Sequence, residues 1–515
     1  MEQTVLKTAT DAIETILAFA LREQLIDPED MRYTRNLLLD AMHMDAPAED
    51  GAAYAEVPPT LTPMLETLEE IAAQEGVIEN TADEKDRFGA RLGGCVTPHP
   101  AQVRAAFRDL YEKKGPEAAT DWFYHLSRMS DYIRVDKIAK NVRFMQESPA
   151  GELEITINLS KPEKDPRDIA KALLAPKVGY PKCALCVENP GYAGRTGFAA
   201  RFNHRILPLT LDDSRWYLQY SPYAYYDEHC IVLNEKHTPM HIGRQTFTRL
   251  LDFVTQFPHY FLGSNADLPI VGGSILTHDH FQGGRHEFPM DKAPDEVVLQ
   301  APKANVHAAI IDWPMSCLRL ESSDRDALET LANELLEAWR KYSDADAGIL
   351  AETYAPHNTV TPIARKTADG YRLDLVLRNN RTDDENPLGI YHPHADLHHI
   401  KKENIGLIEV MGLFILPGRL LTELGELAKY LTGEIALDTV PDEDSPLAKH
   451  YGWVCDIAKK TGTGLTAEQA EAAIHAALGV KCARVLADAG VYKQTAEGRA
   501  AFLRFLATLG YKAAR

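Results

Sequence analysis

The stretch that most constrains this chain runs from Gly272 to Gly284 and reads GGSILTHDHFQGG. The apolar residues before it and the β character of its first half predict a strand that continues to Gln282. Alternate side chains of a strand share a face, so His278, His280 and Gln282 would point the same way. The glycine pairs at both ends let a ligand or another backbone come close. Two imidazoles and a carboxamide directed at one point indicate a site for a phosphoryl group.

These residue types favour a particular kind of phosphoryl chemistry. Imidazole has an ordinary pKa of about 6.5, so much of it is neutral and nucleophilic near neutral pH. Attack of an imidazole on phosphorus would form a covalent phosphoryl-histidine and divide one transfer into two steps. The carboxamide of Gln282 can donate to a phosphate oxygen, but it cannot protonate a leaving group. The pattern therefore suits a leaving group such as a sugar phosphate. The alternative is that the two histidines are core or metal residues.

The composition excludes several other classes of protein. The chain has 515 residues, of which 45% are hydrophobic, which is enough for a large core and more than one structural unit. Its net charge of −20 argues against a nucleic-acid surface, so an anionic ligand needs a local basic pocket. Acidic residues interrupt residues 1–20, and no other long uncharged apolar run is present, so no membrane association is expected. Seven cysteines, an odd number, suit a reducing cytoplasm.

The pair Cys183-x-x-Cys186 has three interpretations. It could be a redox pair, part of a metal site, or two unrelated thiols. There is no second Cys-x-x-Cys in the sequence, so histidines would have to complete a metal site. The histidines are concentrated in the middle of the chain, between His204 and His399.

Several of these strings resemble one known family. His278-Asp-His-Phe-Gln282 is similar to the His-x-His-x-Gln signature of the transferase branch of the histidine-triad superfamily. The 272–284 stretch, residues 183–195 and residues 397–406 resemble the class II (bacterial) galactose-1-phosphate uridylyltransferases, and the resemblance covers most of the chain. Class I relatives carry proline where this chain has Asp279, a residue expected to face away from the phosphate.

The resemblance implies a two-step transfer with a covalent intermediate. His280 would attack the α-phosphorus of UDP-glucose, and glucose 1-phosphate would leave. Galactose 1-phosphate would then attack the uridylyl-histidine and give UDP-galactose, as in the Leloir pathway of galactose metabolism. Gln282 would hold the negative phosphate oxygens during both steps.

The resemblance also implies substrate contacts. Gly273 and Ser274 stand where relatives contact the phosphate, and Asn265 stands where an asparagine touches the phosphates. Asn265 has a second interpretation as a turn residue bonded to local backbone. Asn203 would contact the uridine, and Arg195 is a candidate phosphate contact.

The resemblance further implies a structural zinc ion. Its ligands would be Cys183, Cys186, His237 and His278, with His241 as the alternative to His237. Four nitrogen and sulfur ligands would close a tetrahedron, and its binding energy would hold the loop beside the nucleophile. No second metal is expected at the histidine-rich residues 392–399, which would line the sugar site or cap a strand.

The expected fold is α+β, with two histidine-triad-like halves around an antiparallel sheet core and helical regions at both ends. The predicted division is a mostly helical region 1–175, a half with the catalytic motif at 176–300, a degenerate half at 301–420, and a helical region 421–515. The flanking helices would pack on the core or form a homodimer interface. Residues 132–142 are expected to be an amphipathic helix, and Thr466 with Gln469 fits a capping box.

Three other functions stay open on the sequence. The chemistry could use another hexose 1-phosphate, because the motifs do not show the sugar contacts. A dinucleoside polyphosphate phosphorylase also uses His-x-His-x-Gln, although Cys183-x-x-Cys186 and the helical ends count against it. From a different class, the chain could be a catalytically silent, zinc-scaffolded protein that binds nucleotide sugars.

Overall fold

The computed structural model describes residues 2–160, 178–273 and 275–514 of the chain. Ser274, a predicted phosphate contact, lies outside the described residues. The chain folds into two compact units that alternate along the sequence. The first unit comprises residues 1–140, 160–238 and 278–280, and the second comprises residues 141–159, 239–277 and 281–515. The four-part division predicted from the sequence stays a prediction.

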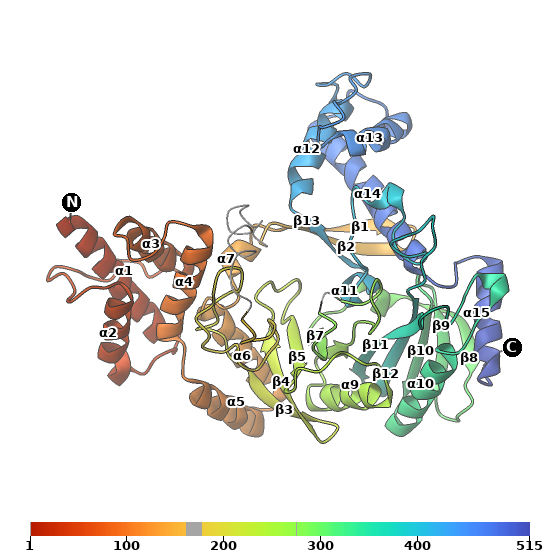
Figure 1. The fold of residues 1–515 in the computed structure, drawn as a ribbon, viewed down its shortest axis with the longest axis horizontal. Helices are drawn as coiled ribbons and strands as arrows, with labels where there is room; N and C mark the ends of the chain where they lie inside the picture. Colours follow the sequence, from red (N-terminus) through yellow and green to blue (C-terminus); the bar gives the residue numbers. More distant parts are fainter. Residues whose placement is uncertain (1, 161–177, 274, 515) are drawn as a thin grey trace. The chain divides into compact units, whose positions relative to one another are not determined.

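The first unit begins with a series of helices, as the sequence predicts. Apolar residues at helical spacing explain them: α1 buries Ile13, Ile16 and Ala20 on one face. Thr81 caps α4 by accepting a hydrogen bond from Glu84 N at 3.2 Å. These helices are drawn in red and orange in Figure 1 and comprise α1 (Glu2–Arg22), α2 (Met31–Ala41), α3 (Thr62–Gln74), α4 (Ala82–Val96), α5 (Pro100–Lys114), α6 (Pro116–Met129) and α7 (Val135–Ile138).

Three antiparallel strands complete the first unit. They are β3 (Leu207–Leu211), β4 (Ser214–Tyr220) and β5 (Cys230–Asn234), and each pairs with the next. In β3, Leu207, Leu209 and Leu211 are buried, which is the alternation of a strand with one face on a core. Strand β5 leads directly into His237, one of the predicted metal ligands.

The chain repeats one order of elements, namely three strands, a helix and two strands. The first copy is β3, β4, β5, α9, β6 and β7, and the second copy is β8, β9, β10, α10, β11 and β12. In the second copy the strands lie in the order β8-β9-β10-β12-β11, with antiparallel pairing throughout. This repeat confirms an α+β fold with two similar halves and an antiparallel sheet. The bounds not yet given are α9 (Arg244–Gln256), β6 (Phe261–Gly263), β7 (His280–Gly284), β8 (Asp295–Gln300), β9 (His307–Ile311), β10 (Cys317–Ser322), α10 (Arg325–Trp339), β11 (Asn358–Thr367) and β12 (Gly370–Asn379).

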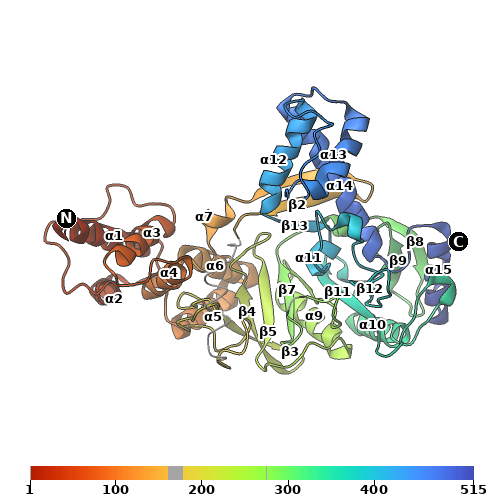
Figure 2. The same cartoon turned by 45° about the horizontal axis from the view of Figure 1, so that its top comes forward.

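A smaller sheet and the C-terminal helices also belong to the second unit. The hairpin of β1 (Val142–Ser148) and β2 (Gly151–Asn158) pairs with β13 (Leu413–Pro417). Figure 2 shows α12, α13 and α14 side by side. Thr466 and Gln469 form the predicted capping box, with hydrogen bonds of 3.2 and 3.0 Å. The remaining elements are α11 (Leu407–Val410), α12 (Arg419–Thr432), α13 (Ala448–Thr461), α14 (Ala467–Ala489), α15 (Ala496–Thr508) and β14 (Lys512–Ala513).

Two local predictions are wrong. Residues 132–142 do not form one amphipathic helix: α7 covers only Val135–Ile138, and Val142 already pairs with Ile157 in the β1–β2 hairpin. The central strand also starts later than predicted, because β7 begins at His280. His278 therefore precedes the strand instead of sharing its face. Its neighbour Asp279 donates its backbone N–H to Thr238 O at 2.7 Å, outside any strand ladder.

Among the described residues, no helix is both long and apolar enough to cross a membrane.

Candidate active site and metal centre

Four side chains of types that can bind a metal ion converge at one point in the first unit. They are Cys183, Cys186, His237 and His278, and their ligand atoms all lie within 4.8 Å of one another. The two sulfur atoms are 3.6 Å apart. The distances from sulfur to a histidine Nδ1 range from 3.2 Å, between Cys186 and His237, to 3.9 Å, between Cys186 and His278. The structure thus brings together all four ligands that the sequence predicts, and His237 takes the place for which His241 was the alternative.

The spacing of these atoms fits a tetrahedral ion. Zinc bonds of about 2.3 Å to sulfur and about 2.05 Å to nitrogen place two sulfurs about 3.8 Å apart and a sulfur and a nitrogen about 3.6 Å apart. The four observed sulfur–nitrogen distances, from 3.2 to 3.9 Å, lie on both sides of 3.6 Å. The observed sulfur–sulfur distance of 3.6 Å is slightly shorter than 3.8 Å. Two thiols and two imidazoles are the ligand types of structural zinc sites. The cluster could therefore hold a metal ion.

Two asparagines that the sequence analysis did not single out orient this cluster. Buried Asn189 donates through Nδ2 to Cys183 O at 3.0 Å and to Cys186 O at 2.8 Å, which fixes the turn that carries both thiols. The backbone oxygen of Asn234 lies 2.8 Å from His278 Nε2. Because a carbonyl oxygen can only accept, His278 carries its proton on Nε2 and presents the Nδ1 lone pair to the cluster.

Burial disfavours charge on two side chains of this cluster. Burial raises the pKa of the Cys183 thiol to about 12, and burial lowers the pKa of His278. Both shifts favour the neutral forms of Cys183 and His278. A divalent ion would convert the thiols to thiolates, and its positive charge would compensate the negative charge that burial disfavours.

His280 occupies the first position of β7 and is suited to act as a nucleophile. Its ring is 6% exposed, and its Nδ1 lies 2.8 Å from the backbone oxygen of His278. Nδ1 must therefore carry the proton, which leaves a lone pair on Nε2. Burial lowers the pKa of His280 to about 4, so the ring is neutral near pH 7. Gln282 lies two residues along the same strand, so the two side chains share a face.

In the second unit, Asn265 and Gly273 lie against one another. A Cβ atom on Gly273 would be 2.9 Å from Asn265 Nδ2, so only glycine fits there without a shift. Asn265 Oδ1 accepts a hydrogen bond from Leu407 N at 2.8 Å, across 142 positions of sequence. Asn265 is therefore bonded to backbone that is distant in the sequence.

Arg195 and Asn203, both in the first unit, already have protein partners. Arg195 donates to Tyr180 O at 3.1 Å and to Tyr192 Oη at 2.8 Å, and its guanidinium lies 4.3 Å from the centre of the Phe198 ring. Asn203 is 5% exposed and donates through Nδ2 to Ser130 O at 2.9 Å. Their predicted contacts with phosphate and uridine stay predictions.

Comparisons with known proteins now identify the family. The family model for the galactose-1-phosphate uridyl transferase N-terminal domain matches residues 25–239. The model for the C-terminal domain of the same family matches residues 253–445. The chain belongs to the galactose-1-phosphate uridyl transferase family.

Relatives within this family match the chain almost from end to end. A galactose-1-phosphate uridylyltransferase of Caldanaerobacter subterraneus is 50% identical over 514 residues, which cover 98% of this chain and 99% of the relative. The protein of that name from Bacillus subtilis is 48% identical and covers 97% of this chain and 98% of the relative. A solved structure of yeast Ap4A phosphorylase Apa2 aligns at 13% identity with a TM-score of 0.29, covering 68% of this chain and 98% of that one. That likeness is too weak to carry an argument.

The histidine-rich residues 392–399 are bonded to other parts of the second unit. His399 Nδ1 lies 2.6 Å from His450 Nδ1, and His450 Nε2 lies 3.0 Å from Glu423 Oε2. Lys401, just after this segment, is 4% exposed, and its Nζ donates to Glu409 Oε1 at 2.9 Å. Lys401 therefore forms a buried ion pair.

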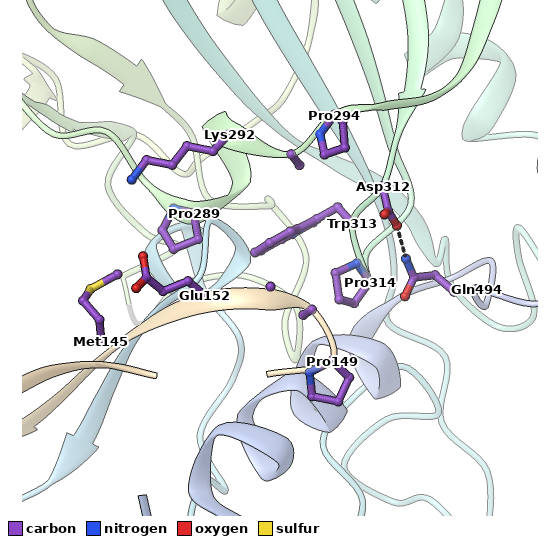
Figure 3. Close-up of a pocket in the computed structure, with 13 residues that line it drawn as sticks. Met145, Pro149, Glu152, Pro289, Lys292, Pro294, Asp312, Trp313, Pro314 and Gln494 are labelled. Carbon is purple, nitrogen blue, oxygen red and sulfur yellow. Dashed lines mark hydrogen bonds between the residues drawn. The ribbon is translucent and has the colours of Figure 1, made fainter. Parts of the chain in front are cut away.

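A cavity of about 260 Å³ lies elsewhere in the second unit (Figure 3). Its lining includes Trp313, four prolines and the charged side chains of Glu152, Lys292 and Asp312. Gln494 donates to Asp312 Oδ1 at 3.2 Å, and the Trp313 indole, which is 2% exposed, donates to Val410 O. None of the predicted site residues lines this cavity.

Proposed function

We propose that the protein transfers uridylyl groups from UDP-glucose to galactose 1-phosphate through a covalent uridylyl-His280. The observation that carries the proposal is the buried, neutral His280, whose Nδ1 donates to the backbone so that Nε2 is free to attack. The names of the nearly full-length relatives support the same activity. The seven cysteines are free thiols, in keeping with a cytoplasmic enzyme of galactose metabolism.

The reaction balances without a proton donor. In the first step the His280 Nε2 lone pair bonds to the α-phosphorus, and the bond from that phosphorus to the bridging oxygen breaks. Glucose 1-phosphate leaves with the electron pair. In the second step a phosphate oxygen of galactose 1-phosphate attacks the same phosphorus, and the P–N bond breaks to restore neutral His280. The proton on Nδ1 stays in its hydrogen bond to the His278 carbonyl in both steps.

We assign the remaining predicted residues to binding. The Gln282 carboxamide donates to a non-bridging phosphate oxygen, and the backbone of Gly273 and the hydroxyl of Ser274 contact the phosphates beside Asn265. Asn203 and Arg195 contact the uridine and phosphate of the nucleotide. Such fixed donors stabilise charge that develops in the transition state, because they need no reorganisation during the reaction.

We also propose that Cys183, Cys186, His237 and His278 hold a structural zinc ion. The ion would join these four side chains in a closed tetrahedron, and it would take no part in the chemistry at phosphorus. Its effect on the site would come through His278, because the backbone oxygen of this ligand accepts the hydrogen bond from His280 Nδ1. The link thereby helps to keep the nucleophile in the required tautomer.

Intact-mass measurement tests the proposed activity. The purified protein is exposed to UDP-glucose alone, and galactose 1-phosphate is then added. We expect a uridylyl adduct that appears and then disappears as UDP-galactose forms. An adduct that persists would move the acceptor to another hexose 1-phosphate. Absence of any adduct would overturn the proposal, and a dinucleoside polyphosphate as donor would then separate a phosphorylase from a silent binding protein.

We expect Asn189→Ala to weaken metal binding about tenfold, because residues that orient metal ligands typically contribute 10–100-fold to affinity. The measurement is a competition between the protein and a chromogenic zinc chelator. The matched control is Asn358→Ala, which removes a buried asparagine that also donates to two backbone carbonyls, those of Trp339 and Tyr342. Equal zinc affinity in the two variants would show that Asn189 supports the fold without orienting the ligands.

A further inference from the structure

The residues from Asn265 to Gly273 form a closed loop directly before the catalytic motif. Ala266 and Gly272 form an isolated parallel bridge that joins the two ends of this loop. A Cβ atom on Gly272 would be 2.6 Å from Ala266 O and 2.7 Å from Leu268 O, so only glycine lets the loop close. Ile270 at the loop tip has φ of +74°, a conformation that costs energy in a β-branched residue. The loop holds this shape because other parts of the second unit restrain it.

The main restraint is the carboxylate of Asp267, a residue that the sequence analysis did not consider. Its side chain is 8% exposed. Asp267 Oδ1 accepts from Thr359 Oγ1 of β11 at 2.5 Å. Asp267 Oδ2 accepts from Ile242 N at 2.9 Å and from Arg340 Nη2 of α10 at 3.3 Å. One carboxylate thus ties the loop to a strand, a helix and the segment before α9.

These contacts reinforce one another. Arg340 Nη2 also donates to Ile242 O at 2.6 Å, so the donors on the Oδ2 side are held together without Asp267. Within the part of the chain that the structure describes, two single hydrogen bonds also restrain the loop, from Leu407 N to Asn265 Oδ1 at 2.8 Å and from Asn380 Nδ2 to Pro269 O at 3.3 Å. The Gly272–Gly273 end has no side chain of its own to anchor it.

We propose that Asp267 is a positioning residue that holds the Gly272–Gly273 backbone in place for the phosphates of the nucleotide sugar. This inference rests on the proposed function and extends it. A carboxylate suits the task because both of its oxygens accept, and both are used. An amide has one accepting oxygen, so Asp267→Asn would turn a donor toward either Thr359 or the Ile242–Arg340 side. A displacement of about 1 Å in a site of this kind can cost about 100-fold in rate.

Single-turnover formation of the uridylyl adduct tests this role. The rate constant and the half-saturating UDP-glucose concentration are measured together, because a residue that supports only the fold would not change their ratio. We expect Asp267→Asn to lower the rate constant about 10- to 100-fold, with the half-saturating concentration within about threefold of the original protein. Thr359→Val removes only the hydroxyl donor, and it should lower the rate constant about threefold to tenfold.

The matched control is Asp291→Asn. The Asp291 side chain is also only 5% exposed. It accepts from an arginine, Arg365 Nε at 2.7 Å, and from a backbone N–H, Phe288 N at 2.7 Å. The Asp291→Asn variant should have a lower thermal stability and an unchanged rate constant for adduct formation. The inference is overturned if both Asp267→Asn and Thr359→Val keep the original rate constant within twofold. If Asp267→Asn does not fold, Thr359→Val decides alone. Failure of the unmodified protein to form any adduct would instead overturn the proposed function.

Discussion

We expect His280→Asn to form no uridylyl adduct and to lower turnover by at least about 10⁴-fold, because loss of a nucleophile removes the covalent route altogether. Asparagine keeps a polar side chain of smaller volume at the start of β7, but its amide nitrogen has no available lone pair. The measurements are intact mass after exposure to UDP-glucose and the rate of UDP-galactose formation.

The control for this experiment is His286→Asn, six positions further along the chain. His286 Nε2 pairs with the Glu154 carboxylate at 2.9 Å, and the residue has no proposed role in the chemistry. The control should keep the adduct and most of the turnover. If His280→Asn still accumulated the adduct, the nucleophile would be another residue. Peptide mapping of that adduct would then identify it.

The second large effect is expected from the metal centre. Replacing Cys183 by serine should reduce bound zinc from about one ion per chain to a small fraction, because the hydroxyl does not ionise as a thiol does. A site filled at 1,000 times its dissociation constant contributes about 4 kcal/mol to the free energy of unfolding, and that contribution would be lost. We also expect slower adduct formation, because His278 is a proposed ligand and its backbone oxygen is the acceptor for His280 Nδ1.

Zinc content by mass spectrometry and thermal unfolding with and without added zinc check this prediction. Cys455→Ser is the control, because Cys455 is a partly exposed free thiol on α13 that does not belong to the cluster. A Cys183→Ser variant that kept a full equivalent of zinc would show that the ion binds elsewhere. Unmodified protein that took up no zinc, with Cys183 and Cys186 fully reactive to thiol reagents, would contradict the metal site itself.

The sequence predicted most of the long elements, because their signals are local. The sequence predicted a mostly helical N-terminal region, and the Thr466–Gln469 capping box marked the start of α14. The prediction failed at residues 132–142, where β1 follows α7. Val142 is a strand residue because β2 folds back onto it, from Ile157, and a helical pattern of 11 residues contains no information about that partner.

The candidate site was also partly visible in the sequence. The His-x-His-x-Gln string predicted the nucleophile and its phosphate contact. The Cys-x-x-Cys pair suggested a metal site, and the family resemblance added His237 as a ligand of that site. The prediction that one strand carries His278, His280 and Gln282 on one face was wrong. His278 precedes β7, and its ring turns to Cys183 and Cys186. The hydrogen bond from His278 Nε2 to Asn234 O sets that direction, and it does not follow from the strand period.

By itself, the sequence determined the family, and it predicted the kind of chemistry and the residues that would carry it, because these depend on side-chain types at short spacings. Only the tertiary structure decided how those residues are held. The tautomer of His280 depends on the backbone carbonyl of His278. Asn189 holds the turn that carries Cys183 and Cys186, and Asp267 ties its own loop to the rest of the second unit. The partners of Asp267 include Thr359, which is 92 positions away in the chain. Contacts of this kind arise from the packing of distant segments, and no local pattern encodes them.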